Sequence, residues 1–470
     1  MSYQVINQKN DFLTRDSAGL ANTTLYCPDC GRDHKVPYQH ILIGQGVRHQ
    51  IAGLVKQAFG GSPQKVGVIY DRAIEAIVES EFLTAFKTDG LNNIGIPLGQ
   101  AGVWLDSTRE IGDDTAQQIP DDIDFLVAVG SGVICDLTKW IATQLHKPFI
   151  LCGTAPSMNG YTSITAVINE HGIKLTKLVD ISYAVVLDTE IIARAPAAMI
   201  QAGVGDLAAR VICNADWKLS QFLKGSYFCP LPYEMTRASE SSYLAAAEGL
   251  SHAEPRAVHQ LCEAMAMSGL SMSILDGETS PSSGGEHIIS HYWDLMNHLE
   301  NAPRNLHGAQ VGVGTMMMLA AYEYFRNLDP TKLDPEKVIG ERLTLDQIVS
   351  MNTLRFGPTA GPLNETSRQK YLSDDQFSRM IHRVIDEWDV LWSTISPYVG
   401  SLTSIRERLL AAGVPLTLES VQRTRTQAID ALLFGGRYRL RTTLLDLIWD
   451  LRLFPEAAEE ILEISRVAKG

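Results

Sequence analysis

Three short motifs, far apart in the sequence, carry side chains that bind divalent metal ions. AGVGDLAAR contains Asp206, GGEHIISHYWD contains His287 and His291, and NLHGAQVGVGT contains His307. One carboxylate with two or three imidazoles suits a zinc-, iron- or nickel-type ion and leaves a position open for substrate. His287 and His291 are four residues apart, so on a helix they share one face. The motifs therefore predict one metal centre.

Each of these side chains also has an ordinary structural explanation. Asp206 follows Gly203 and Gly205, and we expect it to open a helix, where aspartate is a common N-cap. A single helical histidine usually has a structural role or lies on the surface. The joint presence of the three motifs therefore carries more weight than any one of them.

A glycine-rich turn upstream has a form that cradles phosphate groups. FLVAVGSGVICDLTKW places Gly130, Ser131 and Gly132 after an apolar strand and before a helix, whose first N–H groups attract anions. The turn lacks the G-x-G-x-x-G fingerprint, and a tight strand–turn–helix without a ligand explains it as well. A dinucleotide and a metal in one chain together indicate metal-assisted hydride transfer.

Further polar positions follow other strands. Asp71 stands where KVGVIYD ends; there a carboxylate accepts from a ribose hydroxyl and disfavours a 2′-phosphate, or simply caps the next helix. The loop GTAPSMNGYTS follows another strand, at the edge where open α/β sheets bind ligands. A hydrogen-bonded turn explains that loop equally. Its polar side chains are Thr154, Ser157, Asn159 and Ser163.

Short β-rich runs alternate with helical patterns before residue 195, and helical patterns dominate afterwards. The alternation predicts a parallel, doubly wound sheet. We therefore expect a polar, irregular N-terminal extension at 1–35, a dinucleotide-binding α/β domain at 36–195 and an all-α metal and substrate domain at 196–470. The boundary is placed at the neighbourhood of Pro196.

Composition narrows the class of protein. The chain has 470 residues, 45% of them hydrophobic, and a formal net charge of −14. That charge argues against nucleic acid or an anionic membrane as the main partner. Seven cysteines, an odd number, fit a reducing compartment, and the polar N-terminus has no apolar signal core. We expect a cytoplasmic protein without a membrane span.

Five motifs together resemble a known family. AGVGDLAAR, GGEHIISHYWD, NLHGAQVGVGT, VGSGVICDLTK and TAPSMNGYTS, in their order and spacing within residues 25–330, are similar to those of the glycerol-1-phosphate dehydrogenase branch of the iron-containing alcohol dehydrogenase and dehydroquinate synthase-like superfamily. The resemblance implies an α/β dinucleotide-binding domain followed by a helical domain, and a homo-oligomer. It also implies NAD(H) or NADP(H) and one divalent metal, zinc foremost, with nickel or iron as alternatives.

The resemblance assigns roles to individual residues. It makes Asp206, His287 and His307 the metal ligands, and it makes His291 a substrate-contacting and proton-relay residue instead of a ligand. Asn159 falls on a substrate position that is usually Asp in the family, so its neutral amide leaves the substrate open. The implied cofactor contacts are Gly130, Ser131, Gly132, Asp136, Thr154, Ser157 and Ser163, to which the strand position adds Asp71.

The implied reaction is the NAD(P)-linked interconversion of dihydroxyacetone phosphate and sn-glycerol 1-phosphate. The alternatives are a dehydrogenase of an unphosphorylated polyol such as glycerol, a dehydroquinate synthase-like lyase, and a non-catalytic relative. No residue is assigned to the substrate phosphate: Arg210, Lys218 and Arg304 lie near the metal motifs in sequence, but solvated surface positions explain them equally.

Two features depart from the family's usual size. The region after residue 330 is longer than the family needs. The motif CPDCGRDH supplies Cys27 and Cys30, with His34 nearby, which is half of a zinc ribbon. A structural zinc ion needs four ligands, and the chain has no second CxxC pair. The sequence therefore favours a folded N-terminal turn over a metal there.

Overall fold

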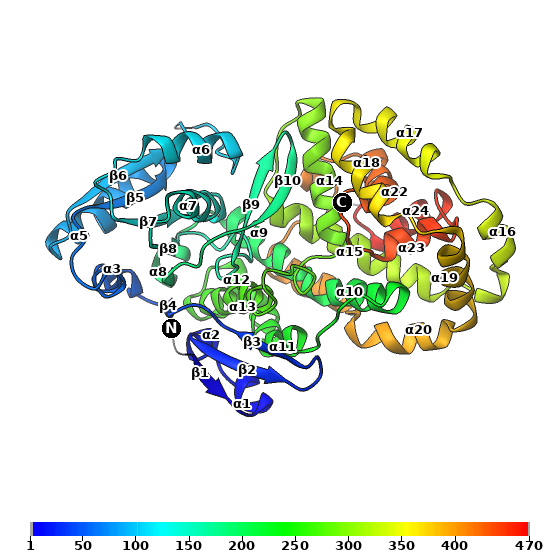
Figure 1. Cartoon of the computed structure of the whole chain (residues 1–470), viewed down its shortest axis with the longest axis horizontal. Coiled ribbons are helices and arrows are strands. Elements are labelled where there is room, and N and C mark those ends of the chain that lie inside the picture. The colour runs from blue at the N-terminus through cyan, green and yellow to red at the C-terminus, as the bar shows by residue number, and fades with distance from the viewer. Residues whose placement is uncertain (1–2, 101, 469–470) are drawn as a thin grey trace. The chain divides into compact units, whose positions relative to one another are not determined.

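The computed structural model describes residues 3–100 and 102–468, and the chain separates into two compact units (Figure 1). The first unit comprises the residues up to Leu207, together with Pro230–Thr279 and Ala411–Gly413. The second comprises Ala208–Cys229, Ser280–Leu410 and the residues from Val414 onward. The domain boundary near Pro196 stays a prediction from the sequence.

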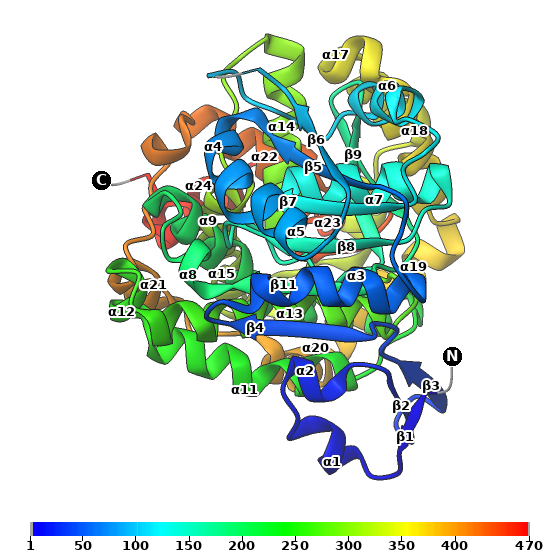
Figure 2. The same cartoon turned by 90° about the vertical axis from the view of Figure 1, so that its left-hand side faces the viewer.

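A six-stranded parallel sheet organises the first unit, as the alternating pattern predicts (Figure 2). The strand order is β4-β11-β8-β7-β5-β6. Every residue of β7, β8 and β11 is buried, which explains why these strands are continuous apolar runs without alternation. The strands are β4 (His40–Gly44), β5 (Val66–Asp71), β6 (Asn93–Leu98), β7 (Phe125–Gly130), β8 (Phe149–Gly153) and β11 (Ala184–Asp188).

Helices cover this sheet and complete the first unit. Residues of α3 and of the helical segment α4–η3–α5, in which η3 is a π-turn, share one apolar cluster with the strands. The helices are α3 (Ile51–Phe59), α4 (Glu75–Val78), η3 (Glu79–Leu83), α5 (Thr84–Thr88), α6 (Arg109–Gln118), α7 (Gly132–Leu145), α8 (Thr189–Ile192), α9 (Ala197–Ala208), α11 (Leu231–Ala245), α12 (Ala247–Ser251) and α13 (Pro255–Ser273).

The N-terminal stretch is not irregular, in contrast to the expectation from its polar sequence. It forms a small sheet in which β1 runs parallel to β2 and β2 pairs antiparallel with β3. The strands are too short for their alternation to stand out, but β2 buries every second side chain. A separate β9–β10 hairpin lies between β8 and β11 in the sequence. These elements are β1 (Gln4–Ile6), α1 (Lys9–Leu13), α2 (Ser17–Leu20), β2 (Thr23–Cys27), β3 (Arg32–Lys35), β9 (Thr165–Glu170) and β10 (Ile173–Leu178).

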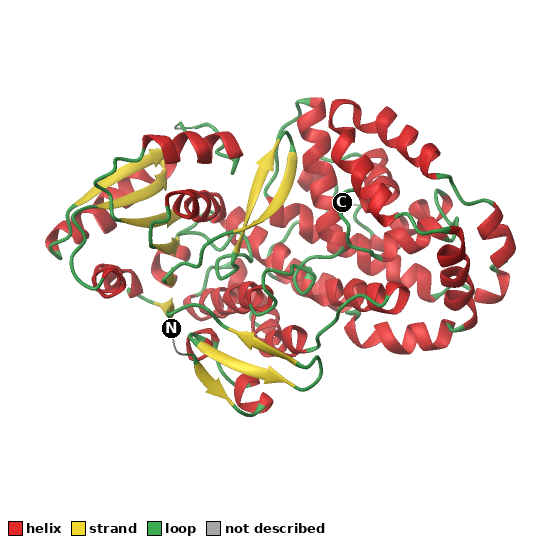
Figure 3. Ribbon diagram, in the orientation of Figure 1, coloured by secondary structure: helices red, strands yellow, loops and turns green. Residues whose placement is uncertain are grey.

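The described residues of the second unit form helices and loops (Figure 3). The apolar run around its three consecutive methionines lies in α15, which is buried against α14 and α24, as expected for a core helix. Among the described residues, none of the helices is long and apolar enough to cross a membrane. The helices are α10 (Arg210–Lys224), α14 (Gly285–Glu300), α15 (His307–Arg326), α16 (Pro335–Gly340), α17 (Leu345–Phe356), α18 (Ala360–Lys370), α19 (Asp374–Asp386), α20 (Trp388–Ile395), α21 (Leu402–Ala411), α22 (Arg425–Phe434), α23 (Leu444–Asp450) and α24 (Glu456–Ser465).

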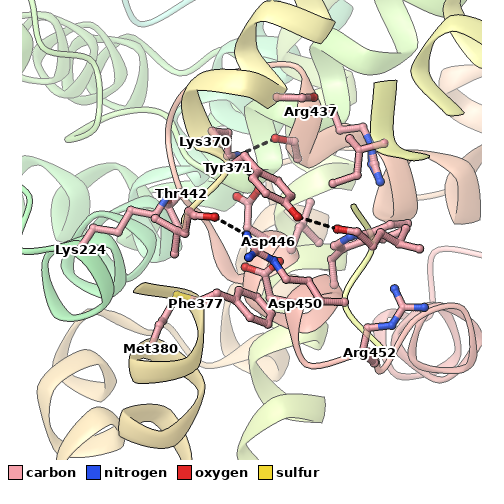
Figure 4. A pocket seen from close by; sticks show the side chains of 18 of the residues that line it. Lys224, Lys370, Tyr371, Phe377, Met380, Arg437, Thr442, Asp446, Asp450 and Arg452 are labelled. Carbon is pink, nitrogen blue, oxygen red and sulfur yellow. Dashed lines mark hydrogen bonds and ion pairs between the residues drawn. The ribbon is translucent and has the colours of Figure 1, made fainter. Parts of the chain in front are cut away.

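A pocket in the second unit holds two neighbouring aspartates (Figure 4). Asp446 pairs with Lys370, with 2.5 Å between Oδ1 and Nζ. Its Oδ2 also accepts from the N–H of Thr443, the N-cap of α23. Burial raises the pKa of Asp450 to about 7, and the negative charge of Asp446 adds to the rise, while Lys224 opposes it. Asp450 therefore holds its proton well above the pH at which an exposed aspartate loses it.

Replacement of Asp450 tests this environment. The folded pKa of Asp450 lies above its unfolded value, so its proton stabilises the fold at acidic pH, and this contribution is lost as the pH rises through about 7. We expect Asp450→Asn, relative to wild type, to gain roughly 1–3 kcal/mol between pH 5 and pH 8. Thermal unfolding over that range measures it. Asp375→Asn, at an exposed position, serves as the control; a parallel pH profile for Asp450→Asn and wild type contradicts the prediction.

Candidate metal centre and cofactor site

Three imidazoles meet where α14 and α15 pack together. His287 and His291 lie one turn apart on α14, and His307 is the first residue of α15. The ring centroids of His287 and His307 are 5.2 Å apart, and those of His291 and His307 are 5.3 Å apart with the rings stacked. Gly314 permits this packing, since a Cβ there would lie 2.7 Å from the Glu286 carbonyl oxygen. The predicted sharing of one helix face is confirmed.

Side chains of α14 fix the orientation of two of these rings. Nδ1 of His287 is 2.9 Å from Oε1 of Glu286, so the carboxylate accepts its proton and directs Nε2 away. Nδ1 of His307 is 3.1 Å from Oγ of Ser290. Hydrogen bonds that hold one ring nitrogen and leave the other for a metal are typical of metal-binding histidines.

Asp206 completes a donor set with these two histidines. One ligand atom from each of Asp206, His287 and His307 lies within 4.8 Å of the other two. Two imidazole nitrogens and a carboxylate oxygen suit a zinc-type divalent ion that keeps a position for substrate. The donor types and the held Nδ1 atoms therefore fit the metal that the resemblance implies.

The expectation that Asp206 opens a helix is wrong. Asp206 lies near the end of α9, which begins at Ala197. Gly203, which suggests a turn in the sequence, is instead a packing requirement: a Cβ there would lie 1.6 Å from the Pro156 carbonyl oxygen. Glycine lets α9 touch the loop that follows β8, at a modest cost in helix propensity.

The contact between α9 and that loop also positions Asn159. The backbone N–H of Asn159 donates to Oδ2 of Asp206 over 2.7 Å. The side chain of Asn159 is 8% exposed, and within the described part of the chain its Nδ2 has no hydrogen-bond partner. A buried amide donor without a partner is costly, so its position beside the candidate metal ligand Asp206 is suited to an oxygen of a bound molecule.

The glycine turn joins β7 directly to α7. Ser131 adopts an extended conformation before the helix, which starts at Gly132. A Cβ on Gly132 would lie 2.5 Å from Cγ of Met158, and one on Gly130 would lie 2.5 Å from Cβ of Ile134. The glycines therefore allow close packing, and the turn brings the unpaired N–H groups at the start of α7 to the carboxyl edge of the sheet.

Other predicted cofactor residues have structural partners. Oδ1 of Asp71 accepts from the Ala73 N–H over 2.9 Å, so the capping explanation is correct whether or not a ribose also binds. Asp136 is buried on α7, where it accepts from the Val167 N–H at 3.0 Å and lies 3.4 Å from Lys139. A contact of these two carboxylates with a cofactor stays a prediction.

The polar loop after β8 lies at the same sheet edge as the glycine turn. The Thr154 N–H donates to the Gly130 carbonyl over 3.0 Å, which places the two segments side by side. Ser163 is buried, and its Oγ lies 2.5 Å from that of Thr165. Ser157 is half-buried and bonds to Tyr161. Thr154 and Ser157 thus lie where a ligand of the turn would reach them, while Ser163 is already satisfied by its neighbours.

Sequence reasoning missed Arg439. Its Nη2 lies 3.4 Å from Nδ1 of His291, and since a guanidinium only donates, Nδ1 accepts and the neutral ring carries its proton on Nε2. Burial lowers the pKa of Arg439, and the nearby Arg441 lowers it further. No spacing rule connects Arg439 to the motif of His291, which lies 148 residues earlier.

Two of the three cations that lie near the metal motifs in sequence, Arg210 and Lys218, have structural partners. Nη1 of Arg210, which is buried, donates to the Pro281 carbonyl over 2.9 Å. Nζ of Lys218 lies 4.4 Å from the ring centroid of Phe228. Of the cations considered, Arg439 is the one that lies against a predicted substrate-contacting residue.

Comparisons with known proteins identify related sequences. The iron-containing alcohol dehydrogenase family matches at residues 42–196. The glycerol-1-phosphate dehydrogenase (NAD(P)+) of Bacillus licheniformis is 32% identical over 319 residues, 65% of this chain and 76% of that protein. The one from Geobacillus thermodenitrificans is 34% identical over 233 residues, 48% of this chain, so that the match spans 57% of that relative.

Solved structures add a likeness in fold. The crystal structure of glycerol dehydrogenase from Schizosaccharomyces pombe matches with a TM-score of 0.56 and 16% identity, over 90% of each chain. Sheet, helical unit and family match together define the iron-containing alcohol dehydrogenase and dehydroquinate synthase-like fold, as the motifs predict. Within this class, the chain belongs to the glycerol-1-phosphate dehydrogenase family.

The Glu286–His287 pair gives a test of the metal centre. Glu286→Gln keeps an acceptor for Nδ1 of His287 but removes the charge that strengthens the hydrogen bond. We expect the affinity for a divalent metal to fall about 10-fold or more, as is usual when such an orienting partner changes. Competition with a chelator measures the affinity. Glu300→Gln, at the exposed end of the same helix, is the control, and an unchanged affinity in Glu286→Gln contradicts the prediction.

Proposed function

We propose that this protein interconverts dihydroxyacetone phosphate and sn-glycerol 1-phosphate with NAD(H) or NADP(H). The observation that carries the proposal is the donor set of Asp206, His287 and His307, whose ligand atoms lie within 4.8 Å of one another. Family membership supports the same reaction, because the curated relatives are glycerol-1-phosphate dehydrogenases. Zinc is the metal we favour, with nickel and iron as alternatives that suit the same ligands.

The cofactor and the metal ion would each supply a different part of the reaction. The reduced nicotinamide would supply a hydride, and the divalent ion held by Asp206, His287 and His307 would supply Lewis acidity toward a carbonyl oxygen. The glycine turn at Gly130 and Gly132, with the loop after β8, would hold the cofactor's phosphates and ribose. The side chains of the protein would position these groups and donate the proton that the reaction requires.

His291 is the proton donor in this proposal. Its Nδ1 accepts from Arg439, so the neutral ring holds its proton on Nε2, from where it can pass to the developing alkoxide oxygen. The ring can then regain a proton from water. Asn159, whose Nδ2 is buried without a partner in the described chain, would donate to a substrate hydroxyl.

Arg439 favours a phosphorylated substrate over glycerol. The guanidinium of Arg439 lies beside His291, and a guanidinium matches phosphate oxygens in a bidentate way. Neither dihydroxyacetone nor glycerol carries a phosphate group that Arg439 could bind. The position of Arg439 therefore supports the proposed reaction over that of a glycerol dehydrogenase with the same candidate metal ligands.

Paired substrates test the proposed reaction. The metal-loaded protein is given NADH or NADPH with dihydroxyacetone phosphate, and in parallel with dihydroxyacetone, while absorbance and released phosphate are followed. We expect cofactor oxidation with the phosphorylated ketone and no phosphate release. Turnover of the unphosphorylated ketone alone indicates a polyol dehydrogenase, and phosphate release at constant absorbance with a phosphorylated substrate indicates a lyase; either result overturns the proposal.

Arg439→Gln separates phosphate binding from support of His291. We expect kcat/KM for dihydroxyacetone phosphate to fall roughly 10- to 100-fold through loss of a charged hydrogen bond. Slow turnover of dihydroxyacetone should change much less, because that ketone lacks the phosphate. Arg379→Gln, at an exposed position on α19, is the matched control. An equal loss with both ketones shows that Arg439 acts on His291 alone.

A further inference from the structure

A second cluster of metal-binding side chains lies at the N-terminal sheet, apart from the residues of the proposed reaction. Cys27, Cys30, His34 and Cys229 each offer one ligand atom, and all four atoms lie within 4.8 Å of one another. Cys27 ends β2, His34 lies on β3, and Cys229 directly precedes Pro230, the N-cap of α11. The sequence alone supplied three of these ligands, and the fold adds Cys229 as the fourth.

The turn between β2 and β3 has the form of a metal-binding knuckle. Gly31 has a φ of +71°, which suits glycine and lets its N–H donate to the Cys27 carbonyl over 2.9 Å. The N–H groups of Asp29 and Cys30 point at the sulfur of Cys27 as donors. Such a turn presents two sulfurs on one side and surrounds the first with donors that stabilise a thiolate.

His34 is held in the orientation that a metal requires. Its side chain is 1% exposed, and its Nδ1 lies 2.8 Å from the carbonyl oxygen of Ile274, at the end of α13. A carbonyl only accepts, so Nδ1 carries the proton and Nε2 presents its lone pair. Nε2 lies 3.2 Å from Sγ of Cys30. Ring orientation by a backbone carbonyl is a recurring feature of metal-binding histidines.

The distances and the donor types agree with a tetrahedral site. Ligands placed roughly 2.3 Å from a zinc ion at tetrahedral corners are about 3.8 Å apart, inside the 4.8 Å limit that the four atoms meet. Three sulfurs and one imidazole fill all four positions, which is the pattern of a closed structural site and leaves none for substrate. Thiolates also select zinc over the harder ions.

We propose that Cys27, Cys30, His34 and Cys229 bind a structural zinc ion, so that the β2–β3 turn is tied to the chain just before α11. The protein then carries two metals of different kinds, one closed by thiolates and one bound by Asp206, His287 and His307. The main alternative for the same residues is a Cys27–Cys30 disulfide, which would leave His34 and Cys229 with no metal ion to bind.

Cobalt distinguishes the two sites. Full-length protein is produced with Co²⁺ in place of zinc, and its metal content and absorption spectrum are recorded. We expect two equivalents of metal and a sulfur-to-cobalt charge-transfer band, which only the cysteine site can give because the other centre has no sulfur ligand. Cys229→Ala should lose the band and one equivalent, whereas His307→Ala should lose one equivalent and keep the band.

Controls separate metal loss from general misfolding. Cys262→Ala removes a buried thiol outside the cluster and should keep both equivalents and the band. Cys30→Ala, at the half-buried member of the cluster, should fold and still lose the band. Absence of the charge-transfer band in the metal-loaded wild type, or a band that survives in Cys229→Ala, overturns the proposal. A failure of dihydroxyacetone phosphate turnover has no bearing on these readouts.

Discussion

The approach of α9 to the loop after β8 is the constraint on which the rest of the candidate site depends. No side chain larger than hydrogen fits at Gly203, since a Cβ would lie 1.6 Å from the Pro156 carbonyl oxygen. This contact allows the Asn159 N–H to reach Oδ2 of Asp206 over 2.7 Å. The loop after β8 and the helix that carries the candidate metal ligand Asp206 are thereby held together, so the candidate cofactor and metal sites are positioned by the same contact.

The order of strands and helices follows from the sequence because it depends on local pattern. β7 and β11 are short apolar runs closed by a polar turn, and such runs are typical of buried parallel strands. The place of Asp206 was misjudged for a related reason. Glycines at 203 and 205 indicate a turn locally, but the requirement at Gly203 comes from Pro156, almost fifty residues away, and no local pattern contains it.

The site divides in the same way into local and distant parts. Glu286 stands next to His287 in the motif, so its orienting role had a signal in the sequence. Arg439 and Cys229 had none, because each is a single residue whose partners lie far away in the chain. The region after residue 330, which is longer than the family needs, contains Arg439. Part of this region therefore lies beside His291, the candidate proton donor. Contacts between residues that are far apart in the sequence depend on the whole fold, so rules based on sequence spacing do not predict them.

Helix α14 concentrates much of this chemistry in six consecutive residues, EHIISH. They include the candidate metal ligand His287, the carboxylate that orients it, the hydroxyl that contacts the other candidate histidine ligand, and the proposed proton donor. A change in the register or pitch of this one turn would disturb all four tasks together. A designer who alters this segment therefore has to treat its positions together, whereas the loops and cations around it can be varied one at a time.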